Sequence, residues 1–147
     1  PSEAAAICAY LAEAFPEAGL LPAPEHRGAY YRWLFFTAAC LEPAASNHAE
    51  GWDPTPDRQR SFGYGSYELV LDTLVGALRG RRYIAGDRFS AADVYLASHL
   101  QWGMMVGVIE KRPEFEAYCA PLVTRPAALR ADAEVKKLQS QKAWSAA

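Results

Sequence analysis

Residues that could act as nucleophiles, acid–base groups or metal ligands are few in this chain and widely spaced. They are the three cysteines and the three histidines: Cys8, Cys40, Cys119, His26, His48 and His99. No Cys-x-x-Cys pair and no zinc-type ligand spacing occurs among them. We therefore predict no metal site and no disulfide framework. Free thiols of this kind are typical of cytosolic proteins, and we expect Cys40 and Cys119 to be core residues.

Ser90 and Asp93 form the pair whose spacing has the clearest mechanism. A serine before a helix accepts from the amide three residues later, while an acidic side chain at that position reaches back to the serine amide. Phe89 and Val94 stand at the positions of a hydrophobic staple around this capping box. We predict a buried helix that begins after Ser90. The pair is a folding device and not a catalytic one.

The elements that position these residues follow from helical periodicity. A stripe that includes Tyr10 and Phe15 predicts a first helix over residues 2–15, which Pro16 ends. Residues 17–24 are rich in proline and glycine and indicate a linker. A long helix follows from residue 25, apolar on all sides, and we expect Pro43 to kink or end it.

Further helices are predicted over residues 64–79, 90–105 and 113–123, with a last one from Pro126 towards Leu138. Gly80 is placed to stop the first of these. Between the helices, residues 46–65 indicate a long surface loop, and the tail from residue 139 is polar. The third helix should turn a set of side chains inward: Phe115, Tyr118, Cys119 and Leu122. Only residues 82–84 look β-like, so the pattern predicts an all-α domain.

Composition excludes several classes of protein. The chain has 51% hydrophobic residues and a formal net charge of −2, which argues against a disordered chain and against binding to nucleic acid or an anionic membrane. The basic cluster Arg79, Arg81 and Arg82 is interpreted as a solvated helix end. The longest apolar run, residues 34–41, is far shorter than the roughly 20 residues that span a bilayer.

Three segments in the same order resemble one family. Residues 83–93, with the sequence YIAGDRFSAAD, closely resemble the motif at the buried sixth helix of cytosolic glutathione transferases. Residues 3–11 resemble the last helix of that family's thioredoxin-like domain, and residues 27–41 resemble its long fourth helix, with bacterial members most similar. The resemblance covers nearly the whole chain.

This resemblance implies a two-domain parent protein. Residues 1–16 would be the last helix of a truncated thioredoxin-like domain, 17–24 a linker and 25–147 the C-terminal helical domain. We expect a bundle of about five helices plus the extra N-terminal one. The catalytic Ser, Tyr or Cys that favours the glutathione thiolate would lie in the thioredoxin-like domain, so the resemblance places no catalytic residue in this chain.

For glutathione, the resemblance implies a contact at the start of the first helix. Glu3 matches an acidic residue that the family directs towards the ligand's amino group. Ala4 stands where the family has serine, so a hydroxyl contact is lost, while the backbone amide could still donate to the γ-glutamyl carboxylate. A plain helix start capped by Ser2 is the alternative.

For the electrophile, the resemblance implies a pocket in the helical domain. Trp102 matches a tryptophan that lines this pocket in some bacterial members, although a plain core role is the alternative. Glu42 and Pro43 stand where those members carry His and Lys, which indicates a different subgroup. Tyr31, Phe35, Phe36 and Met105 are further candidates for the apolar wall of the pocket, and Glu42 is a candidate at its edge.

The sequence therefore predicts that the parent protein conjugates glutathione, as substrate, to small apolar electrophiles. It would act as a cytoplasmic homodimer, and this chain would supply the electrophile pocket and the dimer-forming half. The chain alone should be inactive. The alternative is a non-catalytic binding or assembly module of the same fold, because a fold does not fix a function.

Overall fold

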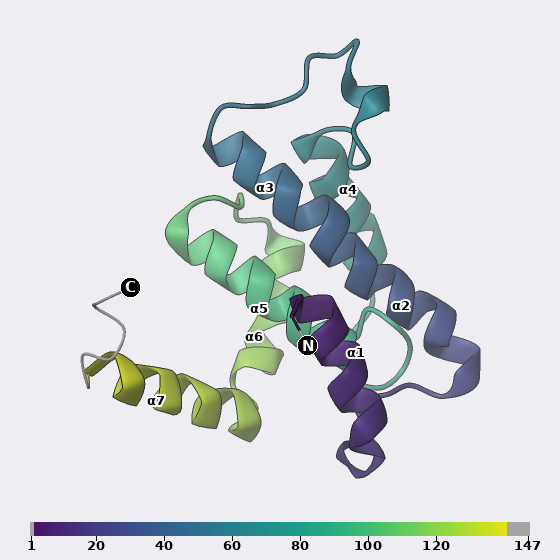
Figure 1. The fold of residues 1–147 in the computed structure, drawn as a ribbon, viewed down its shortest axis with the longest axis vertical. Helices are drawn as coiled ribbons and strands as arrows, with labels where there is room; N and C mark the ends of the chain where they lie inside the picture. The colour runs from purple at the N-terminus through teal and green to yellow at the C-terminus, as the bar shows by residue number, and fades with distance from the viewer. Residues whose placement is uncertain (1, 141–147) are drawn as a thin grey trace.

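A computed structural model describes residues 2–140, and over that range the chain is all-helical with no strand, as predicted (Figure 1). The elements are α1 Ala4–Ala14, α2 Arg27–Phe36, α3 Glu42–Ala49, α4 Tyr67–Leu78, α5 Ala91–Val106, α6 Pro113–Val123 and α7 Pro126–Ser140. Helix α5 is central, since it contacts α1, α2 and α6. None of these helices is long and apolar enough to cross a membrane.

Helices α2 and α3 form one continuous rod that Pro43 does not end (Figure 1). A π turn over Thr37–Leu41 joins them. We attribute this wide turn to Pro43, whose missing N–H and bulky ring disfavour the regular bond to the residue four positions earlier. The helix then runs on to Ala49, so the prediction of a loop from residue 46 is wrong by one turn. With the rod counted once, the described residues form six helices, as expected for the bundle and its extra helix.

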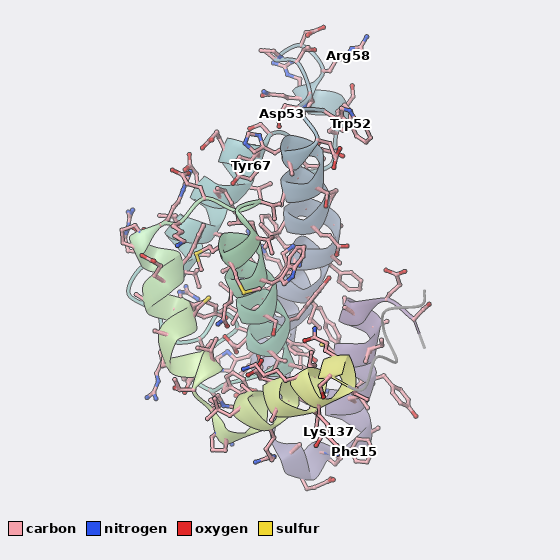
Figure 2. All side chains as sticks on the ribbon, turned by 90° about the vertical axis from the view of Figure 1, so that its left-hand side faces the viewer. Phe15, Trp52, Asp53, Arg58, Tyr67 and Lys137 are labelled. Atoms are coloured by element: carbon pink, nitrogen blue, oxygen red, sulfur yellow. The ribbon has the colours of Figure 1, made fainter. Side chains whose placement is uncertain are left out.

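The loop between α3 and α4 covers residues 50–66 and is closed by ring contacts at its base. The His48 imidazole stacks on the Tyr67 ring with centroids 3.9 Å apart, and its Nδ1 is hydrogen-bonded to Asp53 Oδ2 at 2.7 Å. Figure 2 shows Trp52, Asp53 and Arg58 at one end of the molecule, and Phe15 and Lys137 at the opposite end.

The predicted capping box at the start of α5 is confirmed. Asp93 also accepts hydrogen bonds from residues outside the box. Asp93 is fully buried and its Oδ2 accepts from the backbone amide and the hydroxyl of Ser90, each at 2.9 Å. Its Oδ1 accepts from the Ile84 amide and from the Tyr118 hydroxyl, each at 2.8 Å. One carboxylate thus ties the 83–90 loop, α5 and α6 together.

Helix α6 buries the four predicted side chains, from Phe115 to Leu122. Gly80 adopts φ +70° just beyond α4, which fits the predicted stop. The Phe89 ring lies under the Arg125 guanidinium at 3.5 Å and packs edge-on against Tyr83, whereas Val94 is 38% exposed. The staple between Phe89 and Val94 therefore stays a prediction.

The apolar stripe of α1 does not face the core of this domain, contrary to its amphipathic pattern. Tyr10 and Phe15 are more than half exposed, while the buried residues of α1 are Ala5 and Ala12. Their small side chains let the backbone of α1 lie close to α5. Helix α7 has no buried residue, and the part of the predicted polar tail beyond residue 140 lies outside the described residues.

We predict that Asp93→Asn destabilises the chain by roughly 3 kcal/mol, because an amide nitrogen would meet two buried donors that now bond to one carboxylate oxygen. Thermal or urea unfolding followed by circular dichroism measures the change. Asp87→Asn is the matched control: Asp87 is exposed, and its replacement should change stability by less than about 0.5 kcal/mol. Equal losses for both variants would contradict the proposed role of Asp93.

Candidate ligand-binding face

One side of α5 carries three ring side chains, and the first of them, Tyr95, contacts the start of α3. Tyr95, His99 and Trp102 are spaced i, i+4 and i+7, which places them on the same helical face. The Tyr95 hydroxyl donates to Glu42 Oε2 at 3.2 Å, and the His99 ring lies edge-on to the Tyr95 ring at 6.3 Å. We call Tyr95, His99, Trp102 and Glu42 the α5 face.

Helix α1 packs against α5. The Glu3 charge is a minor cause of the raised pKa of Tyr95. Glu3 immediately precedes α1, and its φ is +68°. Among residues 2–140, it is the non-glycine residue with a positive φ. Glu3 is itself the N-cap residue and no side chain caps the helix, so the alternative of a Ser2 cap is wrong.

Electrostatics keep the α5 face neutral apart from its carboxylate. Burial, together with the charge and hydrogen bond of Glu42, raises the pKa of Tyr95 to about 12. Burial lowers the pKa of His99, and the Glu42 charge only partly opposes this. At neutral pH the face therefore offers a phenol that donates, an uncharged imidazole and one carboxylate.

The cysteines are not activated as nucleophiles. Burial raises the pKa of Cys8 and Cys40, and it raises the pKa of Cys119 to about 11. A raised pKa keeps a thiol protonated and unreactive. Cys119 is buried with its Sγ 3.7 Å from the Ala97 carbonyl, as expected for a core thiol, while Cys40 is only half-buried. No group of three potential metal ligands occurs in the described part of the chain.

The predicted electrophile residues lie on the surface, and the structure brings only some of them together. Trp102 is 55% exposed, so the alternative of a plain core role is wrong. Met105 follows at the edge of the α5 face, and Phe35 is exposed on α2. Tyr31 is engaged elsewhere, since its hydroxyl donates to Glu13 Oε1 of α1 at 2.7 Å.

Tyr95 and His99 are site residues that sequence reasoning missed. Their spacing with Trp102 was a usable signal, because it puts three rings on one face of a predicted helix. The hydrogen bond to Glu42, 53 residues away in sequence, could not be read from that spacing.

Two cavities of the described chain lie away from the α5 face. One of about 270 Å³ and one of about 430 Å³ flank the turn after α4, and both are lined by Gly80, Arg81 and Arg82. Neither is lined by a residue of the α5 face. On the α5 face, Glu42 and Trp102 are exposed, while Tyr95 and His99 are half-buried.

Comparison with known proteins gives consistent matches. Residues 66–126 match the family model described as the C-terminal domain of glutathione S-transferase. The glutathione S-transferase GstA of Escherichia coli O157:H7 is 29% identical over 134 residues, which cover 85% of this chain and 63% of the relative. This chain thus spans less than two thirds of that relative's length.

Solved structures agree. A sphingomonad glutathione S-transferase complexed with glutathione matches with a TM-score of 0.68 at 29% identity, covering 89% of this chain and 66% of its own. The beta-class enzyme of Sphingomonas chungbukensis matches with a TM-score of 0.66 at 28% identity, covering 89% and 67%.

The central capped helix, the long α2–α3 rod and these matches define a glutathione-transferase C-terminal helical domain. Residues 66–126 match the C-terminal domain of glutathione S-transferase, and the chain as a whole is similar in sequence and fold to bacterial glutathione S-transferases.

We predict that Glu42→Gln lowers the pKa of both Tyr95 and His99. The carboxylate disfavours a phenolate and favours an imidazolium, so its loss makes both groups release their protons at lower pH. Tyr95 should stay above its usual value of 10, because burial is the larger cause. NMR titration of labelled tyrosine and histidine measures both, with Tyr95→Phe and His99→Gln to assign the signals. Movement in opposite directions would contradict this arrangement.

Proposed function

We propose that this chain forms the electrophile-binding half of a glutathione transferase that joins the glutathione thiolate to small apolar electrophiles. The observation that carries the proposal is the junction of two sites on one surface. Helix α1, which begins directly after Glu3, packs against α5, the helix that carries the exposed Trp102. The two reactants of a conjugation must meet at such a junction, with the reacting atoms in contact.

Two features support a glutathione contact at Glu3. Its left-handed backbone is strained for a residue with a side chain, and strain of this kind gathers at ligand sites. The free amides of an eleven-residue helix follow directly, and they attract a carboxylate. The sphingomonad relative is a glutathione complex by its description. We propose that Glu3 binds the amino group of glutathione and the Ala4 amide its γ-glutamyl carboxylate.

Catalysis would need a group outside these residues. The three thiols of the chain have raised pKa values, and the Tyr95 hydroxyl already donates to Glu42, so none of them supplies or stabilises a thiolate. We propose that the Ser, Tyr or Cys for this step belongs to a thioredoxin-like domain, of which residues 1–16 are the last helix, before a linker and the helical domain 25–147. The working protein would be a cytoplasmic homodimer.

One observation favours a second candidate. The α5 face is open and holds no activated nucleophile, which also fits a non-catalytic binding or assembly module of the family. Binding of the conjugation product distinguishes the two, because only a transferase needs both reactants on one surface.

The test uses the described chain and S-(2,4-dinitrophenyl)glutathione, which joins both reactants in one molecule. We expect it to shift the NMR signals of Glu3 and Ala4 together with the Trp102 indole signal. S-methylglutathione, the control without the aryl ring, should shift only the first two. Glu3→Gln should weaken both ligands about tenfold, as expected when a charge-assisted bond of about 1.5 kcal/mol or more is removed.

The same chain, mixed with glutathione and 1-chloro-2,4-dinitrobenzene, should give no conjugation above the uncatalysed rate. Turnover by the chain itself would refute the assignment of the catalytic group to another domain. Failure of the product to shift any of the three signals would instead favour the assembly module.

A further inference from the structure

We propose that the larger of the two cavities beside the turn after α4 binds a phosphate monoester of a hydroxylated compound, such as a sugar phosphate. The cavity has a volume of about 430 Å³, within the range typical of small-molecule sites. Two segments far apart in sequence line it, His26 before α2 and residues 80–87 after α4. None of these residues takes part in the proposed conjugation, so the site is a further one on the same chain.

The segment after α4 is strongly basic in a chain whose formal net charge is −2. Residues 79–88 hold four arginines and one aspartate: Arg79, Arg81, Arg82, Arg88 and Asp87. No ion pair within residues 2–140 involves any of these four guanidinium groups. A single arginine is enough to offset the negative end of α4, which carries about half an elementary charge. The other guanidinium groups therefore keep their charge for a ligand.

Arg81 and Arg82 both line the cavity, and the local geometry holds them there. Gly80, with φ +70°, turns the chain directly after α4, and the Arg81 amide donates to the Leu78 carbonyl at 3.0 Å. The Arg82 guanidinium lies over the Tyr83 ring, 5.3 Å from its centroid. This cation–π contact restrains a long side chain, so less conformational entropy is lost when the side chain binds a ligand. Two neighbouring guanidinium groups suit a phosphate, whose oxygens accept bidentate hydrogen bonds.

His26 supplies a third donor from a separate segment. Its ring packs on the backbone of Gly86, where an added Cβ would lie 3.1 Å from His26 Cγ. His26 is also the N-cap residue of α2, so the positive end of that helix lies beside the cavity. An imidazole N–H and the start of a helix both favour an anion.

Asp87 decides between a bare anion and an ester. It lines the same cavity, is exposed, and forms no ion pair with Arg81 or Arg82. Its carboxylate repels a second anionic group on the ligand, but it accepts hydrogen bonds from hydroxyl groups. A ligand with one phosphate and neighbouring hydroxyls therefore satisfies the basic side chains and Asp87 together.

The smaller cavity fits such a ligand less well. It has a volume of about 270 Å³ and shares both arginines, but no histidine lines it. Its other walls include the apolar side chains of Leu78, Ala117 and Pro121, together with the carboxylate of Glu114. A hydroxylated ligand would lose hydrogen bonds to water there without gaining protein partners. We therefore assign the phosphate ester to the larger cavity.

The test titrates glucose 6-phosphate, inorganic phosphate and glucose into the chain while the arginine Nε–H and histidine ring signals are followed by NMR. We expect saturable shifts at Arg81, Arg82 and His26 with both phosphates and none with glucose. Glucose 6-phosphate should bind about threefold more tightly than inorganic phosphate, as expected for added hydrogen bonds at an exposed site. Raising the salt concentration to about 1 M should weaken both.

Arg82→Gln should weaken both phosphates about fivefold, because one exposed charge-assisted contact is lost. Arg82→Lys should restore only part of the affinity, since an ammonium group lacks the planar fork of a guanidinium. Arg58→Gln is the matched control. Arg58 is an exposed arginine of the loop between α3 and α4 that lines neither cavity, so its replacement removes the same charge and should leave binding unchanged. Circular dichroism checks that each variant is folded.

Asp87→Asn tests the choice of an ester. With the negative charge removed, inorganic phosphate should bind more tightly, and the preference for glucose 6-phosphate over it should shrink. An unchanged preference would overturn the role of the hydroxyl groups. The site itself would be overturned if neither phosphate gave saturable shifts, if glucose shifted the same signals, or if Arg58→Gln weakened binding as much as Arg82→Gln.

Discussion

The buried carboxylate of Asp93 accepts four hydrogen bonds from three separate parts of the chain, and the helical arrangement depends on it. A carboxylate without partners in an apolar core would be very costly, so its burial is tolerable only when every donor is in place. This requirement fixes where α5 starts, how the 83–90 loop enters it and where Tyr118 of α6 lies. Since α5 also contacts α1 and α2, its position is passed on to the rest of the bundle.

The same constraint orients the candidate site. Once the start and rotation of α5 are set by Asp93, the side of the helix that bears Tyr95, His99 and Trp102 must face the α2–α3 rod and α1. The π turn before Glu42 then decides where the carboxylate sits on that rod. A regular helix would carry Glu42 to a different angle, because each residue adds about 100° of rotation and a π turn changes the sum. The contact between Tyr95 and Glu42 is therefore a product of two local irregularities, one cap and one widened turn.

These two irregularities explain how far the sequence could predict the structure. The helices, the Gly80 stop and the inward set of α6 follow from periodicity and caps, which are local signals. The capping box could be predicted from the spacing of three between Ser90 and Asp93. The hydrogen bonds that Ile84 and Tyr118 donate to Asp93 could not be predicted from the sequence. Pro43 was expected to kink or end the helix; the helix continues through a π turn, so the predicted loop from residue 46 begins too early. The pattern of α1 predicted that its larger apolar side chains face the core, but Ala5 and Ala12 are the buried residues. Alanine allows a closer approach to α5 than a larger side chain does.

The carboxylates of Asp93 and Glu42 show how the same functional group behaves differently when it is buried and when it is exposed. Asp93 has no access to water and its oxygens are all engaged, so it can only hold structure. Glu42 is exposed, and among residues 2–140 one of its oxygens has no donor, so its charge is screened by solvent. A charge that stabilises the fold cannot also bind a substrate without opening the core. The capping carboxylate and the exposed carboxylate are therefore different residues, and α5 links them because it carries both Asp93 and Tyr95, whose hydroxyl donates to Glu42.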